Sequence, residues 1–315
     1  MRPWLSIVAL AALLAPTAAA QDDHAALAEL VERAGTIAVA RAAHVDRTDG
    51  ATLRVTFAVE RRLRGAPPDT VVLSESRGPG CGRALAAVAP GQRFVVCLVE
   101  RDGALALVAG GARALPPARA AVVAHVAALV AAAPGAARTA VVVGALGDHD
   151  ERVREDAAFA LPMLPALEQL DPAQRALVLG ALQRAVGGGE RTAPALVAAA
   201  VRLRLVPALD VLLPRYLDGS SGPAERMFAD AMARIDAETL AGRVAARLDQ
   251  LAGPLDRARA TTLLCSLEVA AARAPLLQLA RDSRERGTRA RACAGLLRLG
   301  ADARELADVA DPELL

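Results

Sequence analysis

DERVREDAAFALPML, residues Asp150 to Leu164, has the clearest helical pattern in the chain. Asp150 suits a helix N-cap, because its carboxylate accepts hydrogen bonds from backbone N–H groups that the first turn leaves unpaired. One face of the helix is apolar and carries Val153, Ala157, Ala160, Leu161 and Leu164. The other side carries Arg152, Arg154, Glu155 and Asp156. Because the apolar face is mostly alanine, neighbouring helices can approach closely, and one is needed on each side to bury enough area.

This assignment of faces predicts the effect of two substitutions. Ala157→Asp should place an unpaired charge between helices and destabilise the protein strongly. Glu155→Ala, on the polar side, should be nearly neutral.

The pattern Asp-x-x-Val-Arg-x-x-Ala-Ala-x-Ala-Leu in this segment resembles the second helix of a bacterial HEAT repeat. The matching residues are Asp150, Val153, Arg154, Ala157, Ala158, Ala160 and Leu161. A looser copy, TRARACAGLLRLG, occupies residues 288–300. The resemblance implies helical hairpins that hide their apolar faces only by stacking, and such stacks usually bind other proteins along one surface.

Helical patterns continue in pairs to the end of the chain, which predicts a HEAT-like α-solenoid over residues 137–315. The expected pairs are 138–146 with 151–164, 172–186 with 192–205, 208–217 with 223–235, 237–251 with 256–271, and 275–282 with 287–299. The second helices start 41, 31, 33 and 31 residues apart, near a HEAT-like period. Asp171 and Gln174 predict a capping box, Gly187 to Gly189 a loop, and Ala303 the start of a short last helix.

The N-terminal part shows a different periodicity. Short runs rich in Val, Leu and Thr lie between Gly, Pro and Asp turn signals, after a short helix at 27–33. The runs are 36–44, 51–61, 70–74, 93–100 and 104–109, which predict five strands of a small β-barrel or sandwich. In the second run Leu53, Val55, Phe57 and Val59 alternate with polar or small residues, so one face should be buried.

The order of these runs resembles the OB-fold of secreted netrin-like and TIMP-like modules. The matching segments are Val55-Thr56-Phe57-Ala58-Val59, Leu63-Arg64-Gly65, Cys81-Gly82 and Pro90-Gly91-Gln92-Arg93-Phe94-Val95-Val96. The expected fold class is therefore a two-domain α+β protein, with an OB-like five-stranded barrel at 21–115 and a bridging helix within 116–136. TIMP-type inhibitors chelate a protease metal with an N-terminal cysteine, whereas the expected mature start here is Gln21.

Residues 1–20 read as a secretory signal peptide. Arg2 begins it, Trp4 to Leu14 forms an apolar core too short to span a bilayer comfortably, and Ala18 to Ala20 supplies small residues for cleavage. The alternative is an uncleaved membrane anchor. We expect a secreted or periplasmic protein without membrane insertion after cleavage.

The composition argues against nucleic acid as the partner. The 315 residues carry a formal net charge of +2, whereas nucleic-acid binding usually needs a basic patch. Hydrophobic residues make up 54% of the chain and aromatic residues only 2%, so Ala, Leu and Val must build the core.

No catalytic, cofactor-binding or metal-ligating set stands out. The four histidines, His24, His44, His125 and His149, have neither helical i, i+4 spacing to one another nor a cysteine at ligand spacing. Asp148-His149-Asp150 favours a solvated turn over a cation site. Ser220 and Ser221 favour a turn, with Ser221 capping the next helix. We therefore expect no enzyme and no cofactor.

The four cysteines divide into two groups. In an exported protein, Cys81 and Cys97 are expected to form a disulfide between the Gly-rich loop and the fourth strand. Cys265 and Cys293 lie in successive second helices, which stack roughly 8–10 Å apart. A disulfide needs Cα atoms within about 7 Å, so these two are expected to be buried free thiols.

Arginine recurs in the first turns of the second helices, and an aspartate precedes each one in the connecting turn. The pairs are Asp148 with Arg154, Asp218 with Arg226, Asp249 with Arg257, and Asp282 with Arg289. A positive charge at a helix start opposes the helix dipole, so compensation is expected. The favoured interpretation is a ladder of arginine–aspartate pairs, because a guanidinium pairs bidentately with a carboxylate. In the other, the arginines point free and bind an acidic partner.

These observations predict an extracytoplasmic, non-catalytic interaction or scaffold protein with an unknown protein partner along the solenoid. The alternative is a secreted enzyme inhibitor or regulator that acts through the TIMP-like β domain. An enzyme with its site between the domains has least support, because titratable groups do not cluster.

Overall fold

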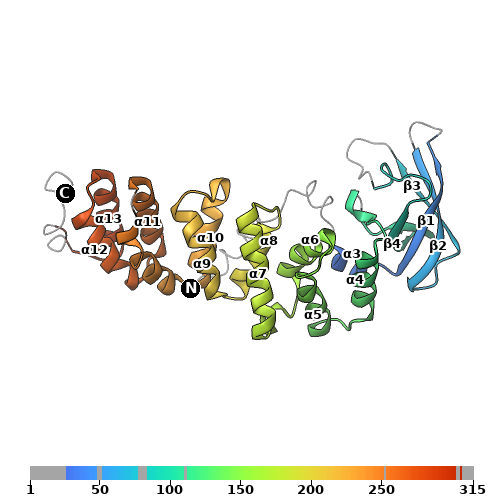
Figure 1. Cartoon of the computed structure of the whole chain (residues 1–315), viewed down its shortest axis with the longest axis horizontal. Coiled ribbons are helices and arrows are strands. Elements are labelled where there is room, and N and C mark those ends of the chain that lie inside the picture. Colours follow the sequence, from blue (N-terminus) through green and yellow to red (C-terminus); the bar gives the residue numbers. More distant parts are fainter. Residues whose placement is uncertain are drawn as a thin grey trace. The chain divides into compact units, whose positions relative to one another are not determined.

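The computed structural model describes residues 26–47, 52–76, 84–109, 112–251, 253–302 and 306. The chain divides into two compact units, Met1–Leu170 and Asp171–Leu315, whose elements are labelled in Figure 1. The expected signal peptide and most of the helix expected near Ala303 lie outside the described residues. Within the described part, no helix is both long and apolar enough to cross a bilayer.

The first unit contains one curled antiparallel sheet. A short helix, α3 (Leu27–Arg33), precedes its strands, which are β1 (Thr36–Asp46), β2 (Thr52–Arg64), β3 (Thr70–Ser76), β4 (Arg93–Arg101) and β5 (Ala104–Leu107). The strand order is β3-β2-β1-β4-β5, and all neighbours are antiparallel. The edge strands β3 and β5 approach each other, so the sheet forms a half-barrel. The five expected strand segments are confirmed.

Both faces of the sheet bury apolar side chains. One face holds a core that includes Leu53, Val55 and Phe57, as the alternation in β2 predicted. Phe57 meets Phe94 edge to face, with ring centroids 6.2 Å apart. On the other face Ile37 lies opposite Cys97, and both are buried outside that core. There α3 contacts β4, and α4 (Ala120–Ala131) contacts β2.

The turn after β2 fastens the sheet to α3. Arg64 donates hydrogen bonds to the carbonyls of Val31 and Ala34 at the C-terminal end of α3. Gly65 has a φ of +69°, and a Cβ there would lie 2.9 Å from the carbonyl oxygen of Gly35 and from Thr36 Oγ1. Only glycine fits this backbone conformation and this close approach without strain.

The helices of the first unit complete its core. They are the 3₁₀ turn η2 (Ala112–Ala114), α4, α5 (Ala136–Ala145), α6 (Glu151–Ala160) and the turns η3 (Leu161–Met163) and η4 (Leu167–Gln169). Asp150 caps α6 by accepting from the backbone N–H groups of Arg152 and Val153, as predicted. All five residues of the predicted apolar face are buried. α6 packs against α3, α4 and α5, so the first hairpin belongs to the unit that holds the sheet, whereas the sequence interpretation placed it in the solenoid.

The second unit is a stack of helical hairpins. Its helices are α7 (Pro172–Gly188), α8 (Ala193–Arg202), α9 (Leu209–Leu217), α10 (Glu225–Ala245), α11 (Pro254–Leu267), α12 (Arg273–Asp282) and α13 (Arg286–Arg298), and its 3₁₀ turns are η5 (Val206–Ala208), η6 (Gly222–Ala224), η7 (Leu248–Gln250) and η8 (Ala270–Ala272). α10 packs against α8 and α11, and α11 packs against α13. These are the predicted second helices, which lie side by side in one layer.

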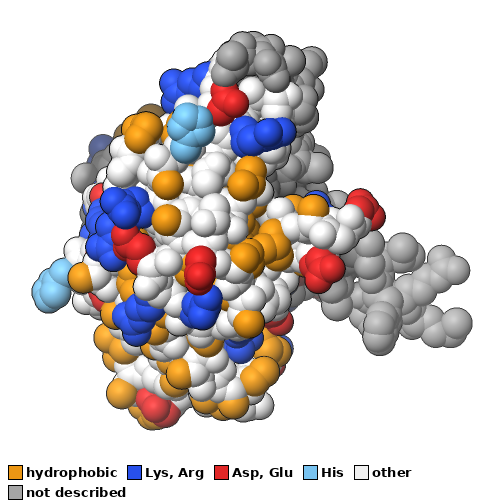
Figure 2. Space-filling view, turned by 90° about the vertical axis from the view of Figure 1, so that its right-hand side faces the viewer, with side chains coloured by type: hydrophobic (Ala, Val, Ile, Leu, Met, Phe, Trp, Pro, Cys, Tyr) orange, Lys and Arg blue, Asp and Glu red, His pale blue; other side chains and the backbone are white. Residues whose placement is uncertain are grey.

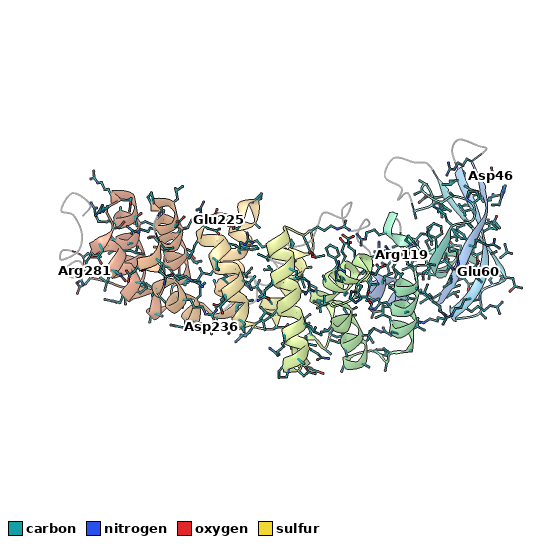
Figure 3. All side chains as sticks on the ribbon, in the orientation of Figure 1. Asp46, Glu60, Arg119, Glu225, Asp236 and Arg281 are labelled. Carbon is teal, nitrogen blue, oxygen red and sulfur yellow. The ribbon has the colours of Figure 1, made fainter. Side chains whose placement is uncertain are left out.

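α10 joins two predicted helices without a loop. Asp236 inside it has φ −168° and ψ 100°, which is extended backbone. The break matches the expected boundary between the helices at 223–235 and 237–251. Asp236 then caps the second half, because its carboxylate accepts from the backbone N–H of Thr239 at 2.9 Å. Figure 3 shows Glu225 and Asp236 at opposite ends of the first half.

Three local predictions have different outcomes. The capping box of Asp171 and Gln174 is present. The loop expected from Gly187 is wrong, because α7 continues to Gly188, and Gly189 with φ +65° ends it. The cap expected from Ser221 is absent, and its buried hydroxyl has no hydrogen-bond partner.

Of the cysteine predictions, the disulfide is wrong and the two buried free thiols are confirmed. Cys97 is a free buried thiol, so the expected disulfide to Cys81 is not formed, and Cys81 itself lies outside the described residues. Burial raises the pKa of Cys97 to about 12. Cys265 and Cys293 are free and buried, as predicted. Cys265 packs so closely on Gly295 that a Cβ there would lie 2.4 Å from the sulfur.

Candidate functional site

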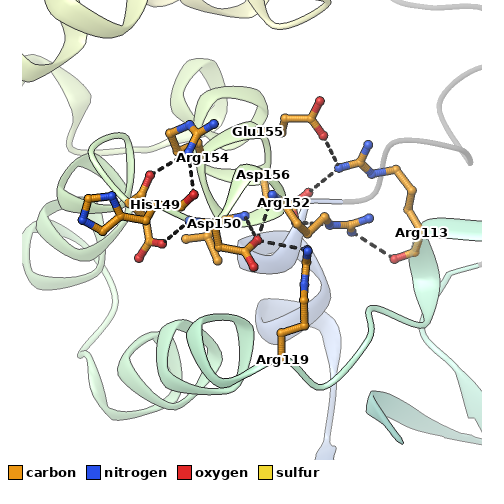
Figure 4. A network of polar contacts seen from close by, with 10 residues as sticks. Arg113, Arg119, His149, Asp150, Arg152, Arg154, Glu155 and Asp156 are labelled. Atoms are coloured by element: carbon orange, nitrogen blue, oxygen red, sulfur yellow. Dashed lines mark hydrogen bonds and ion pairs between the residues drawn. The ribbon is translucent and has the colours of Figure 1, made fainter. Parts of the chain in front are cut away.

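A connected group of charged side chains lies at α6 (Figure 4). Arg113, in the turn η2, pairs with Glu155 at 2.9 Å and with Asp156 at 3.5 Å. Arg152 pairs with Asp156 from one turn earlier in α6, and its guanidinium also donates to the carbonyl of Arg113 at 3.1 Å. Nearby, Arg119 pairs with Asp150 at 3.0 Å. The network therefore joins the segment after β5 to the first helical hairpin.

The network corrects the polar side assigned to this helix. The side chain of Asp156 is 1% exposed, and those of Glu155 and Arg113 are 15% and 12% exposed. Asp156 lies three residues after Val153 and four before Ala160, which places it on the apolar face. In the sequence, this spacing is the pattern that indicates burial of Asp156. No local sequence pattern indicates that Arg113 belongs to this network, because its partners Glu155 and Asp156 lie about forty residues away in the sequence.

Burial sets the electrostatics of these groups. It raises the pKa of Asp156 to about 6, against the opposing attraction of Arg152 and Arg113. Burial lowers the pKa of Arg152, whereas the attraction of the Asp156 carboxylate raises it. Each of these charged groups has a partner of opposite charge. Buried pairs of this kind are costly to break on one side only, so the network helps to hold α6 against the segment after β5.

Arginines near the starts of the second helices serve the turns before them. Arg154 donates to the carbonyl of Asp148 at 2.9 Å, Arg257 to that of Leu251 at 3.0 Å, and Arg289 to that of Ser283 at 3.0 Å. In each case the acceptor lies six residues earlier. The guanidinium thus satisfies carbonyl groups that the preceding turn leaves without a helical partner.

The predicted arginine–aspartate pairs are therefore wrong at Arg154 and Arg257, which bond to carbonyls instead. Two of the aspartates order their own turns: Asp148 accepts from the backbone N–H of Asp150 at 2.7 Å, and Asp218 from that of Ser220 at 2.8 Å. Asp249 accepts from the side-chain amide of Gln278 at 3.1 Å. Arg226, at the fourth position, is exposed.

The histidines do not come together. His44 and His149 are exposed, and His24 lies outside the described residues. His125 on α4 is buried, which lowers its pKa despite the attraction of Asp148. Across the described ranges, no three His, Cys, Asp or Glu side chains lie close enough to hold a metal ion.

A small cavity of about 190 Å³ opens between η7, α11 and α12. Its lining includes Asp249, Arg257, Gln278 and Asp282. Ligand pockets usually measure about 300–1,000 Å³. Two of the polar lining groups, Arg257 and Asp249, already bond to Leu251 and Gln278. The cavity is therefore a weak candidate for a small-molecule site.

The exposed part of the sheet carries mixed charges. Glu60 on β2 pairs with Arg93 at 2.7 Å and with Arg41 at 3.3 Å, and Arg62 pairs with Asp69 at 2.7 Å. Figure 2, which faces this end of the molecule, shows basic and acidic side chains interspersed. Among the side chains that the structure describes, this surface shows no extended patch of one sign.

The stacked helices of the second unit present a different surface. We call it the second-helix face and define it by the outward residues Arg226, Asp230 and Arg234 on α10, Thr262 and Ser266 on α11, and Arg291 and Arg298 on α13, all of which are exposed. On each helix these residues are spaced by four or seven, which places them on one stripe. Four arginines and one aspartate give this face a surplus of positive charge.

Comparisons with known proteins find no relative. No family model matches the chain, and neither curated proteins nor solved structures show detectable similarity to it.

Proposed function

We propose that this chain is an extracytoplasmic, non-catalytic protein that binds another protein through HEAT-like helical hairpins. The second-helix face carries the proposal. Its helices α10, α11 and α13 lie side by side, and the described contacts leave Arg226 and Arg234 without a fold partner. Other arginines pair with carboxylates or donate to carbonyls, among them Arg113, Arg257 and Arg259. Arginine is enriched at protein–protein interfaces relative to the rest of the protein surface.

The β domain is proposed to be OB-like. The order β3-β2-β1-β4-β5, in which long β1 pairs with both β2 and β4, supports this proposal, as does the approach of β3 to β5. We assign this domain the role of an N-terminal cap or a second binding module.

Export is part of the proposal and rests on the pattern of residues 1–20. N-terminal sequencing of the natural protein should find Gln21 as the first residue, in protein recovered outside the cytoplasm. Intact Met1 on cytosolic protein would contradict export.

Site-specific photo-cross-linking tests the interaction. A photoreactive residue replaces either exposed Thr262 on α11 or exposed Ala43 on β1, in the full chain expressed in its source cell. We expect one discrete cross-linked protein from position 262, identified by mass spectrometry. A product from position 43 alone would favour the alternative of a secreted inhibitor or regulator that acts through the β domain. Absence of any product from either position would contradict the proposal.

A further inference from the structure

We propose that the second-helix face binds an acidic, extended segment of a partner protein. This inference rests on the proposed function and names the chemistry of the partner. The segment would place carboxylates over α10 and α13 and small or apolar residues over α11.

The stripe on α10 has charges that the fold does not neutralise. Arg226, Asp230 and Arg234 are exposed at intervals of four residues. Within the described part of the chain, Arg226 and Arg234 form neither a hydrogen bond nor an ion pair, although Asp230 lies one turn from each. Arg226 precedes Asp230 by four residues, which is the less favourable orientation for a helical ion pair, whereas Asp230 precedes Arg234 in the favourable one, and neither pair forms in the described structure. The two guanidinium groups are therefore available to carboxylates from outside.

The stripe on α13 is also basic. The helix contains four arginines and no acidic residue. Arg291 and Arg298 are exposed seven residues apart, and Arg298 also contacts the thiol of Cys265. Leu297 beside them is 56% exposed. A partner segment here would meet positive charge next to an apolar side chain.

The exposed side chains that define the stripe on α11, between them, are neutral, while Arg259 on the same side is mostly buried and pairs with Glu225 and Asp256. Thr262 donates to the carbonyl of Ala258 at 2.9 Å, and Ser266 to that of Leu263 at 2.7 Å, so both hydroxyls are directed back to their own helix. Leu255 at the start of α11 is 69% exposed. This middle strip offers shallow contact with small or apolar side chains, and it separates the two basic stripes.

The spacing of the helices sets the length of the partner segment that can bind across them. Packed helices lie about 8–10 Å apart, so α10 and α13 are separated by roughly 16–20 Å across α11. An extended chain advances about 3.3 Å per residue, so about six residues span the two basic stripes. A nucleic-acid backbone has uniformly spaced phosphates and would leave some of them over the neutral strip and near Asp230. An acidic peptide with a neutral centre fits the charge pattern better.

The test measures binding of the full mature chain to the fluorescent peptide Glu-Asp-Ala-Ser-Asp-Glu by anisotropy. We expect Arg234→Glu combined with Arg291→Glu to weaken binding at least about tenfold, a loss of about 1.4 kcal/mol. The control is Arg281→Glu, an exposed arginine on α12 in the other layer, which should change affinity less than about twofold. Raised salt should weaken wild-type binding. Circular dichroism verifies that all variants keep their helices.

Several results would overturn the inference. One is equal affinity of the double variant and the wild type for the peptide. Another is tighter binding of a single-stranded DNA oligonucleotide than of the peptide. If the product cross-linked from position 262 persists in the double variant, the proposed function stands and the acidic-segment inference fails. If cross-linking and peptide binding are both absent, both proposals fail.

Discussion

At the scale of single residues, Asp156 is the most deeply buried carboxylate of the charged network at α6. Its carboxylate is buried between Arg113 and Arg152, and burial raises its pKa to about 6. An acid whose pKa is higher in the folded than in the unfolded protein binds its proton more tightly when folded. It therefore contributes stability that is fully present below the unfolded pKa of 3.8 and is lost as the pH rises through about 6.

This linkage predicts how Asp156→Asn changes the pH dependence of unfolding. Between pH 4 and 7 the wild type should lose up to about 3 kcal/mol of stability relative to the variant, since one pKa unit corresponds to about 1.4 kcal/mol. Urea unfolding of both proteins across this range measures the difference. Parallel stability curves would show that Asp156 has the same pKa in the folded and unfolded chains.

Ala157, on the same helix, is 1% exposed and packs in the core. Ala157→Asp should lower the free energy of unfolding by several kcal/mol, because the new carboxylate has no partner there. Ala140→Asp on α5, an exposed helical position, is the matched control and should cost well under 1 kcal/mol. Equal melting temperatures would mean that the assigned face is wrong.

The structure changes the predicted effect of Glu155→Ala on stability. Because Glu155 pairs with Arg113 in a mostly buried setting, its removal should cost more than the nearly neutral change expected from the sequence. Periodicity alone identified the apolar residues of α6. It could not identify Arg113, because the contact joins segments about forty residues apart and depends on how the sheet packs on the helix.

At the scale of elements, the turn after β2 depends on one glycine. Gly65→Ala should destabilise the protein by about 2 kcal/mol or more, since its φ is positive and a Cβ would approach Gly35 and Thr36 too closely. Gly91→Ala is the control, because φ there is +85° but no atom lies within 4 Å. Thermal unfolding compares the two. A cost at Gly65 no larger than at Gly91 would contradict the close approach.

The recurring arginine at the second helices gives another test. Arg257→Ala should cost roughly 1–3 kcal/mol, because the carbonyl of Leu251 loses a charged donor. Asp249→Ala should add to this loss with a coupling below about 0.5 kcal/mol, because Asp249 bonds to Gln278 instead. A double-mutant cycle by chemical denaturation measures the coupling. A larger coupling would restore the ladder interpretation.

The positions of most strands and helices could be predicted because their signals in the sequence are local. Strand and helix positions follow from local alternation and from turn residues such as those around Gly65, and these signals lie within a few neighbours. The acceptors of Arg154 and Arg257 were mistaken, because a turn offers carboxylates and carbonyls at similar distances along the sequence. Only the turn geometry decides which of them faces the guanidinium.

At the scale of the whole molecule, the chain divides between Leu170 and Asp171. We expect residues 171–315 to fold alone, with helical circular dichroism and a cooperative thermal transition. A fragment that starts at Ala173 loses the capping box of Asp171 and Gln174 and should be less stable by about 1 kcal/mol. A gradual, non-cooperative transition of the longer fragment would contradict its independence.

The extended residue inside α10 limits how this protein can change in length. A loop can absorb an inserted residue, but Asp236 alone connects the two halves of the helix. One residue inserted directly after it would turn the second half by about 100° around its axis. The buried side chains of Leu240 and Val244 would then face away from the core. Insertions and deletions should therefore be tolerated in the turns between the other helices and excluded at this joint.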